Sequence, residues 1–412
     1  MREINREQNP IFQPNNNQGY QPIYRKNGAS RIANRRLLIL FALIMLPILA
    51  ACTRNIGDES DGWNPPVSVG GVVYVGTKDG QVVSLTEDES GNLKENWTFP
   101  GTTGQQDLIG VYKTPVVVGD LVYVNGIDGF LYALDKESGN LTGDGWRRPD
   151  NPFVEPEPLV AGPAYDSSND IILSPSEDGK LYAYTAKNGN EFWDPFVTGG
   201  PIWSTPRVER GVAYFGSHDY KVYAVTLSDG KEHWSFETEG VVAGKPLVFD
   251  GKVIAGSFDK SLYALSVEDG EPVWTVEGEN WFWAGAVTDG RTIFAPNMDG
   301  NIYAIDRNGN LLWTYNVGSP IVSSPVLVPS GLVVAGKDGN LLLLDTSTDS
   351  LGLRRVLFNQ KIGDAEIKAP LFAVEDSVYV GSQDKTVRRI DFQDGQRNVW
   401  CLDTRGEDGC IN

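Results

Sequence analysis

The chain has 412 residues, and its 54 Asp and Glu against 35 Lys and Arg give a formal net charge of −19. An acidic protein of this kind is a poor partner for nucleic acid or for an anionic bilayer surface. Its two histidines do not lie in a zinc-like spacing, and no Ser-His-Asp arrangement or phosphate-binding loop occurs. We therefore expect no metal site and no bound cofactor.

Residues 1–36 form a polar leader with few apolar side chains, which predicts a disordered segment. Three arginines near its end precede an apolar run at residues 37–51. That run is short for a transmembrane helix but has the length of a signal-peptide core. Because the positive charges stay in the cytoplasm, the chain beyond the run is expected to be exported.

The apolar run ends in Leu49-Ala50-Ala51-Cys52, which resembles a bacterial lipobox. The resemblance implies that the leader is cleaved off, that the Cys52 thiol carries a diacylglyceryl group, and that residues 53–62 form a tether. An uncleaved signal anchor, with the leader kept in the cytoplasm, is the alternative. From Cys52 onward, 28 Lys and Arg face 52 Asp and Glu, a formal charge of −24. This charge favours cationic segments of other proteins as partners, although solubility alone would also explain it.

Between Pro66 and Trp400 one unit of four short strands recurs eight times. Each unit carries an aspartate in a tight turn, 39 to 50 residues from the next: Asp79, Asp128, Asp178, Asp219, Asp259, Asp299, Asp338 and Asp384. Each opens at a proline, or once at Ala286, and closes at a tryptophan, or once at Phe358. A strand-only repeat of this length predicts one all-β domain, an eight-bladed β-propeller of four-stranded blades over residues 63–403.

The eight aspartates admit two interpretations, turn formation or metal ligation. Asp-Gly, which follows the second strand in five units, is a strong hairpin signal. One carboxylate per turn supplies too few oxygens for calcium, so the pattern favours turn chemistry in every blade.

The third strand and the closing tryptophan together resemble the quinoprotein-type (PQQ-like) propeller repeat across about the whole of residues 63–403. In that family the blade-ending Trp docks on the neighbouring blade beside a small alanine. Five units carry that alanine: Ala133, Ala183, Ala224, Ala264 and Ala304. Three depart from it: Ser84, Leu343 and Arg389.

Two cysteines end the chain, Cys401 near the last tryptophan and Cys410 in a tail at residues 404–412. In an exported protein they are candidates for a disulfide, or they remain two free thiols. The tail is too short for a further blade.

The connectors between units are rich in aromatic residues. Three residues before each unit's opening position stand Trp63, Tyr112, Val160, Trp203, Ala243, Trp283, Val322 and Ile367, and Trp281 and Phe282 lie in the connector that contains Trp283. Such connectors gather at one mouth of a propeller, where Trp and Tyr are typical of binding hot spots. Trp203, Trp281 and Trp283, with Trp63 and Tyr112, are thus candidate partner-binding residues. The alternative is that they pack between blades.

The whole architecture resembles lipoproteins of the BamB type, in which a short tether leads to eight PQQ-like blades. The resemblance implies a non-catalytic scaffold that is held on the cell membrane or outer membrane and binds protein partners, with a role in outer-membrane protein assembly. Two alternatives remain, a cell-surface sensor of peptides or carbohydrates and a PQQ-dependent dehydrogenase. The dehydrogenases carry adjacent cysteines and much longer chains, and this sequence has no such cysteine pair.

Overall fold

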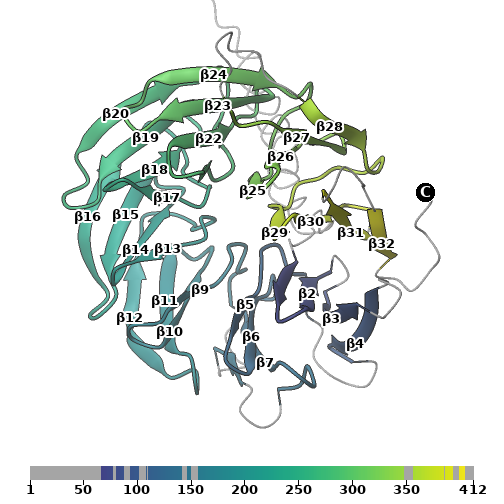
Figure 1. The fold of residues 1–412 in the computed structure, drawn as a ribbon. Helices are drawn as coiled ribbons and strands as arrows, with labels where there is room; N and C mark the ends of the chain where they lie inside the picture. The colour runs from purple at the N-terminus through teal and green to yellow at the C-terminus, as the bar shows by residue number, and fades with distance from the viewer. Residues whose placement is uncertain are drawn as a thin grey trace, which may run out of the picture. The chain divides into compact units, whose positions relative to one another are not determined.

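The computed structural model describes residues 66–77, 80–87, 93–101, 108, 110–141, 146–149, 156–347, 356–384, 386–392 and 399–403. These residues form 32 β-strands and no helix, so no helix among them could cross a membrane. The strands make eight antiparallel four-stranded sheets, each built from four consecutive strands (Figure 1). The predicted eight-bladed propeller is confirmed.

Each blade starts near the propeller axis with a short strand (Figure 1). These innermost strands are β1 (Val67–Val69), β5 (Val116–Val118), β9 (Ala164–Asp166), β13 (Arg207–Glu209), β17 (Leu247–Phe249), β21 (Val287–Thr288), β25 (Val326–Val328) and β29 (Phe372–Val374). The second strands are β2 (Val72–Gly76), β6 (Leu121–Asn125), β10 (Ile171–Pro175), β14 (Val212–Gly216), β18 (Lys252–Gly256), β22 (Thr292–Pro296), β26 (Gly331–Ala335) and β30 (Ser377–Gly381).

The remaining two strands of each blade lead outward. The third strands are β3 (Val82–Glu87), β7 (Leu131–Asp135), β11 (Lys180–Thr185), β15 (Lys221–Thr226), β19 (Ser261–Ser266), β23 (Asn301–Asp306), β27 (Asn340–Leu344) and β31 (Thr386–Asp391). The outermost strands are β4 (Leu93–Phe99), β8 (Trp146–Arg148), β12 (Glu191–Val197), β16 (Lys231–Glu237), β20 (Pro272–Glu277), β24 (Leu311–Asn316), β28 (Val356–Lys361) and β32 (Val399–Asp403).

The core consists of apolar clusters between adjacent blades. The described residues form eight clusters, one at each of the eight blade junctions. At the junction that closes the ring, Val75 and Leu85 of the first blade pack with Tyr379 and Val387 of the last. Since each sheet contains four consecutive strands, the ring is closed by this packing and not by a strand shared between the chain ends.

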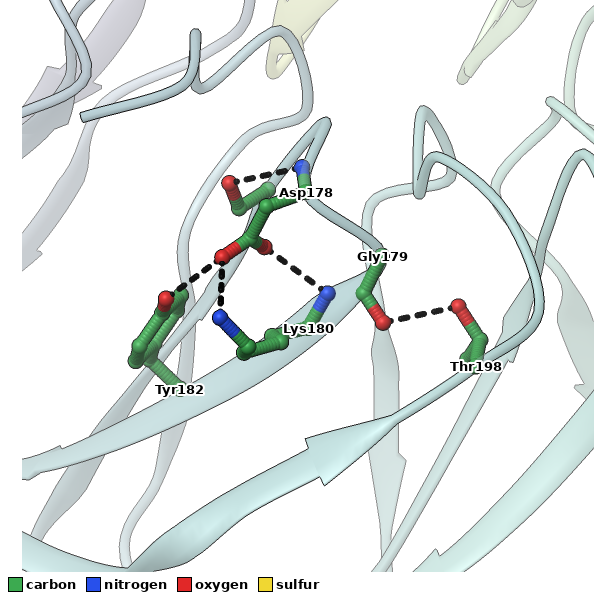
Figure 2. Close-up of polar contacts among 6 residues, drawn as sticks. Asp178, Gly179, Lys180, Tyr182 and Thr198 are labelled. Carbon is green, nitrogen blue, oxygen red and sulfur yellow. Dashed lines mark hydrogen bonds and ion pairs between the residues drawn. The ribbon is translucent and has the colours of Figure 1, made fainter. Parts of the chain in front are cut away.

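The repeated aspartates hold the turns between second and third strands, as Asp178 shows (Figure 2). One carboxylate oxygen accepts the Lys180 N–H at 2.9 Å, and the other accepts the Tyr182 hydroxyl at 2.7 Å. The Thr198 hydroxyl donates to the Gly179 carbonyl at 2.9 Å and so ties the turn to the next connector. The aspartate–tyrosine bond recurs in four other blades: Asp128–Tyr132, Asp219–Tyr223, Asp259–Tyr263 and Asp299–Tyr303. Asp79 lies outside the described residues.

In the last blade the turn aspartate bonds to a different residue. Arg388 replaces the tyrosine, is 8% exposed, and donates from Nη2 to Asp384 at 2.9 Å. This guanidinium and the Thr386 hydroxyl lower the pKa of Asp384 against the opposing effect of burial. A buried arginine is therefore matched by the turn carboxylate that is present in every blade.

The blade-ending tryptophans dock on the next blade, but the small residue beneath them there is glycine. Trp234 donates from Nε1 to the Val267 carbonyl at 3.1 Å and lies against Gly270 of the following blade. Ala224 is instead the cross-strand partner of Trp234 within its own sheet. Phe358 holds the equivalent place in the seventh blade, where it pairs with Leu343.

Candidate partner-binding face

One end of the propeller is built from two kinds of loop that hydrogen-bond to each other. The connectors lead from an outermost strand to the next innermost strand, and the turns join second to third strands. Backbone N–H groups of the turns donate to the connectors, from His218 to Pro201 and from Phe258 to Val241 at 2.9 Å, and from Met298 to Trp281 at 3.0 Å. We call the surface formed by these connectors and turns the connector face.

Four aromatic rings meet on the connector face across the fourth, fifth and sixth blades. Trp281 stacks on Phe258 with centroids 4.6 Å apart and planes 4° apart. Phe258 also stacks on Trp283 at 5.0 Å, and Trp283 lies 6.3 Å from Trp203. We call Trp203, Phe258, Trp281 and Trp283 the aromatic cluster. It unites three of the four tryptophans that the sequence singled out.

The backbone brings Trp203 and Trp283 together from connectors that are not adjacent. Ala243 holds the equivalent position in the connector between them and is buried. A methyl side chain there leaves the two indoles free to approach each other.

Polar groups fix the orientation of Trp203. Its Nε1–H donates to Glu177 Oε1 at 2.8 Å, and its ring lies edge-on to His218 with centroids 4.2 Å apart. Burial raises the pKa of Glu177, and the bond from Trp203 opposes that rise. Burial lowers the pKa of His218, whose Nε2 is buried without a hydrogen-bond partner in the described part of the chain. Burial thus disfavours the charged form of this imidazole beside the indole.

The cluster is a surface and not a core. Trp281 is 40% exposed, while Trp203, Phe258 and Trp283 are half-buried. Phe282, between two of these tryptophans in the sequence, is fully buried and packs against Tyr303 at 5.4 Å. Phe282 therefore packs between blades, whereas Trp281 and Trp283 remain accessible at the surface.

The other sequence candidates do not join this cluster. Tyr112 lies in the connector before β5, in a different part of the ring. Trp63, Cys52 and Cys410 lie outside the described residues, and Cys401 is described only as a backbone partner of Arg388. The lipidation and the disulfide therefore stay predictions. Among the residues that the structure covers, no three His, Cys, Asp or Glu side chains are grouped to hold a metal ion.

Sequence reasoning missed two members of the site, Phe258 and His218. Both occupy the position directly before the turn aspartate, and the backbone N–H of this position bonds to the connector in the second to eighth blades. A comparison of this position across the eight repeats could have identified both residues. The residues there are Lys78, Ile127, Glu177, His218, Phe258, Met298, Lys337 and Gln383. The variable character of this position marks it as a surface position.

The sequence matches a family model over most of its length. Residues 53–201, 142–240, 177–326 and 298–409 match the model of a family described as outer membrane protein assembly factor BamB. No curated protein sequence is significantly similar to the chain.

Solved structures share the fold at low sequence identity. The crystal structure of BamB from Moraxella catarrhalis is 19% identical, with a TM-score of 0.54 over 68% of this chain and 82% of that one. The computationally designed Ika8 protein is 16% identical, with a TM-score of 0.64 over 84% and 98% of the two chains. The C-terminal WD40 domain of Sif2 is 13% identical, with a TM-score of 0.61 over 79% and 93%. These similarities establish the propeller fold.

Proposed function

Because the chain belongs to the family described as outer membrane protein assembly factor BamB, we propose that it is a non-catalytic scaffold that binds protein partners. The aromatic cluster is the observation that carries this proposal. Rigid loops on a propeller are suited to presenting binding residues, and clustered Trp side chains dominate protein interfaces. A scaffold of this kind needs no reactive group at its binding face.

The partner that suits the face is an extended segment with basic and apolar side chains. Acidic residues lie on the connector face near the aromatic cluster: Glu177 accepts the bond from Trp203, Glu279 shares a connector with Trp281, and Glu239 lies on the connector between β16 and β17. An arginine or lysine over an exposed indole gains cation–π attraction, and these carboxylates strengthen it. The formal charge of −24 beyond residue 51 would steer such a segment toward the protein.

The proposal includes export and a membrane anchor at Cys52. The charge pattern around residues 37–51 and the lipobox-like ending support both. In a cell with an outer membrane, the scaffold would act on outer-membrane proteins during their assembly, as the family description suggests. Its place would be the outer face of the cell membrane or the outer membrane.

Fluorescence anisotropy with labelled synthetic peptides tests the proposal. The peptides copy strands of outer-membrane β-barrel proteins, with and without Arg and Lys. We expect the wild type to bind the basic peptides and Trp281→Ala to weaken binding about tenfold or more, as loss of a hot-spot residue does. Phe192→Ala is the matched control, because Phe192 is an aromatic residue 37% exposed on β12, away from the connector face.

Three results would contradict the proposal as stated. Loss of binding in Phe192→Ala with full binding in Trp281→Ala would move the site to a blade edge, where a partner strand could add to the sheet. Binding of oligosaccharides in place of every peptide would favour a carbohydrate sensor. Equal binding by all three proteins would leave the aromatic cluster without a role.

A further inference from the structure

Three cationic side chains lie where the chain enters innermost strands, close to the propeller axis. Lys113 stands three residues before β5, Arg207 is the first residue of β13, and Lys245 stands two residues before β17. These strands surround the axis (Figure 1). The positions are therefore among those nearest the axis at the connector face.

Contacts across the connectors link the three residues. A Cβ placed on Gly162 would lie 3.1 Å from the Cβ of Lys113 and 3.1 Å from Thr205 Oγ1, so this glycine separates the two side chains. The Gly162 N–H donates to Thr205 Oγ1 at 2.9 Å, and Thr205 is two residues from Arg207. Arg207 in turn acts electrostatically on Lys245. These contacts connect the segments that carry the three cations, which belong to the second, fourth and fifth blades.

None of the three has its charge fully matched by the protein. In the part of the chain that the structure describes, Lys113 and Lys245 form no hydrogen bond or ion pair. Arg207 pairs through Nη2 with Glu209 at 3.1 Å, but its buried Nε has no acceptor.

Other connectors show that this fold can supply a partner at the same level. Lys337 and Lys368 both pair with Glu366, at 3.3 Å and 3.0 Å. Lys368 lies two residues before its blade-opening proline, as Lys113 does. Among the residues that the structure describes, no carboxylate pairs with Lys113 in this way, so the difference belongs to this part of the ring and not to the fold.

The two lysines are enclosed by protein but still reached by water. Lys113 is half-buried and Lys245 is exposed, yet the protein around them lowers the pKa of each through loss of hydration. The charge of Arg207 lowers the pKa of Lys245 further. Enclosed cations that lack partners gain more from a bound anion than cations on an open surface do.

We propose that Lys113, Arg207 and Lys245 form a binding site near the axis for an oxyanion, the carboxylate or phosphate group of a ligand. The three side chains supply two ammonium groups and a guanidinium, the groups that bind these anions in proteins. The site shares no residue with the aromatic cluster, and its occupant need not be a protein.

Isothermal titration calorimetry of the exported portion, from Cys52 to the end of the chain, tests this site with two probes, inorganic phosphate and acetate, at constant ionic strength set by chloride. We expect saturable binding of at least one probe, weakened tenfold or more in Lys245→Ala and in Lys113→Ala. Lys187→Ala is the control of equal charge change, since Lys187 is exposed in the turn between β11 and β12 at the opposite end of the propeller. Circular dichroism spectra establish that each variant is folded.

The two probes distinguish the sources of the oxyanion. Binding of phosphate alone identifies a phosphorylated ligand, and binding of acetate alone identifies a carboxylate. Absence of saturable binding of either probe by the folded wild type would overturn the proposal. Equal weakening in Lys187→Ala and Lys245→Ala would do the same, because the effect would then be one of net charge.

Discussion

The indole of Trp234 lies so close to Gly270 of the next blade that a Cβ on that glycine would sit 2.6 Å from the ring. The same pairing of a blade-ending tryptophan with a glycine of the following blade recurs at Trp97–Gly139, Trp146–Gly189, Trp193–Gly230 and Trp274–Gly309. Each pair joins neighbouring blades at a fixed distance. Each repeat therefore contains the residues that form the junction between blades as well as those that form the blade itself.

Gly270→Ala should destabilise the propeller through this contact. Gly270 also has a φ of +75°, so alanine meets backbone strain as well as the indole. Gly251→Ala controls for the strain, because Gly251 has a φ of +72° and nothing within 4 Å of an added Cβ. In urea unfolding we expect about 1–2 kcal/mol of destabilisation for Gly251→Ala and about 1–3 kcal/mol more for Gly270→Ala. Equal losses of unfolding free energy in the two variants would show that the indole moves aside for the added methyl group at no cost in stability.

Trp234→Ala, which removes the indole, should destabilise the propeller more than Gly270→Ala, which adds a methyl group. Trp234 is 6% exposed, and Trp234→Ala should lower the free energy of unfolding by about 3–5 kcal/mol. Trp281→Ala removes the same side chain from an exposed position and should change it by about 1 kcal/mol or less. Both values come from urea titrations followed by circular dichroism. Similar losses for the two variants would contradict a structural role confined to the blade junction.

Arg388 should be replaceable by the residue that the other blades use. Arg388→Ala leaves the Asp384 carboxylate without its main partner and should cost about 1–3 kcal/mol. Arg388→Tyr offers a hydroxyl to Asp384, as Tyr182 does to Asp178, and should recover most of that loss. Unfolding free energies of the two variants compare them directly. Equal destabilisation would mean that the last blade has lost the geometry of the repeat.

The Asp384–Arg388 pair also predicts a dependence of stability on pH. The folded protein holds the pKa of Asp384 below its ordinary value of 3.8. The contribution of Asp384 is therefore complete above that ordinary value and is lost as the pH falls through the lower pKa of the folded state. Unfolding free energies measured between pH 6 and pH 3 should fall less steeply in Arg388→Ala than in the wild type. An equally steep fall in the unfolding free energy of both proteins would show that the Asp384–Arg388 pair does not cause the pH dependence.

His218 should report its protonation through the tryptophan beside it. Burial holds its pKa below the ordinary 6.5, and an imidazolium close to an indole quenches indole fluorescence. Tryptophan emission should therefore fall on acidification with a midpoint below 6.5, and the folded state should lose stability as the pH falls through this range. His218→Gln should abolish the transition. A midpoint at or above 6.5 would contradict the burial of the imidazole.

Cys52→Ser should prevent lipid attachment if the lipobox resemblance holds. Wild-type protein grown with labelled fatty acid should carry the label and lack residues 1–51, whereas the variant should remain unlabelled and retain its leader. Mass spectrometry of the purified proteins measures both properties. Wild-type protein that keeps its leader would favour the signal anchor and remove the lipid from the proposed function.

The sequence by itself determined the fold, because a propeller repeats one local arrangement of strands and turns. Asp178 and its equivalents fix a turn through bonds two and four residues away, which a single unit of sequence contains. The regular spacing of the aspartates then gives the number of blades. The identity of Phe358 as a blade end also followed from spacing alone.

The tertiary structure decided which residues share a surface. Trp203 and Trp283 are eighty residues apart, and their contact depends on the curvature of the ring. Phe282 is buried although both of its neighbours in sequence belong to the aromatic cluster, because a one-residue step reverses the direction of a side chain. The same holds for the buried Nε of Arg207, whose missing acceptor becomes visible only once the blades are arranged around the axis, since hydrogen-bond pairing is a property of space and not of sequence.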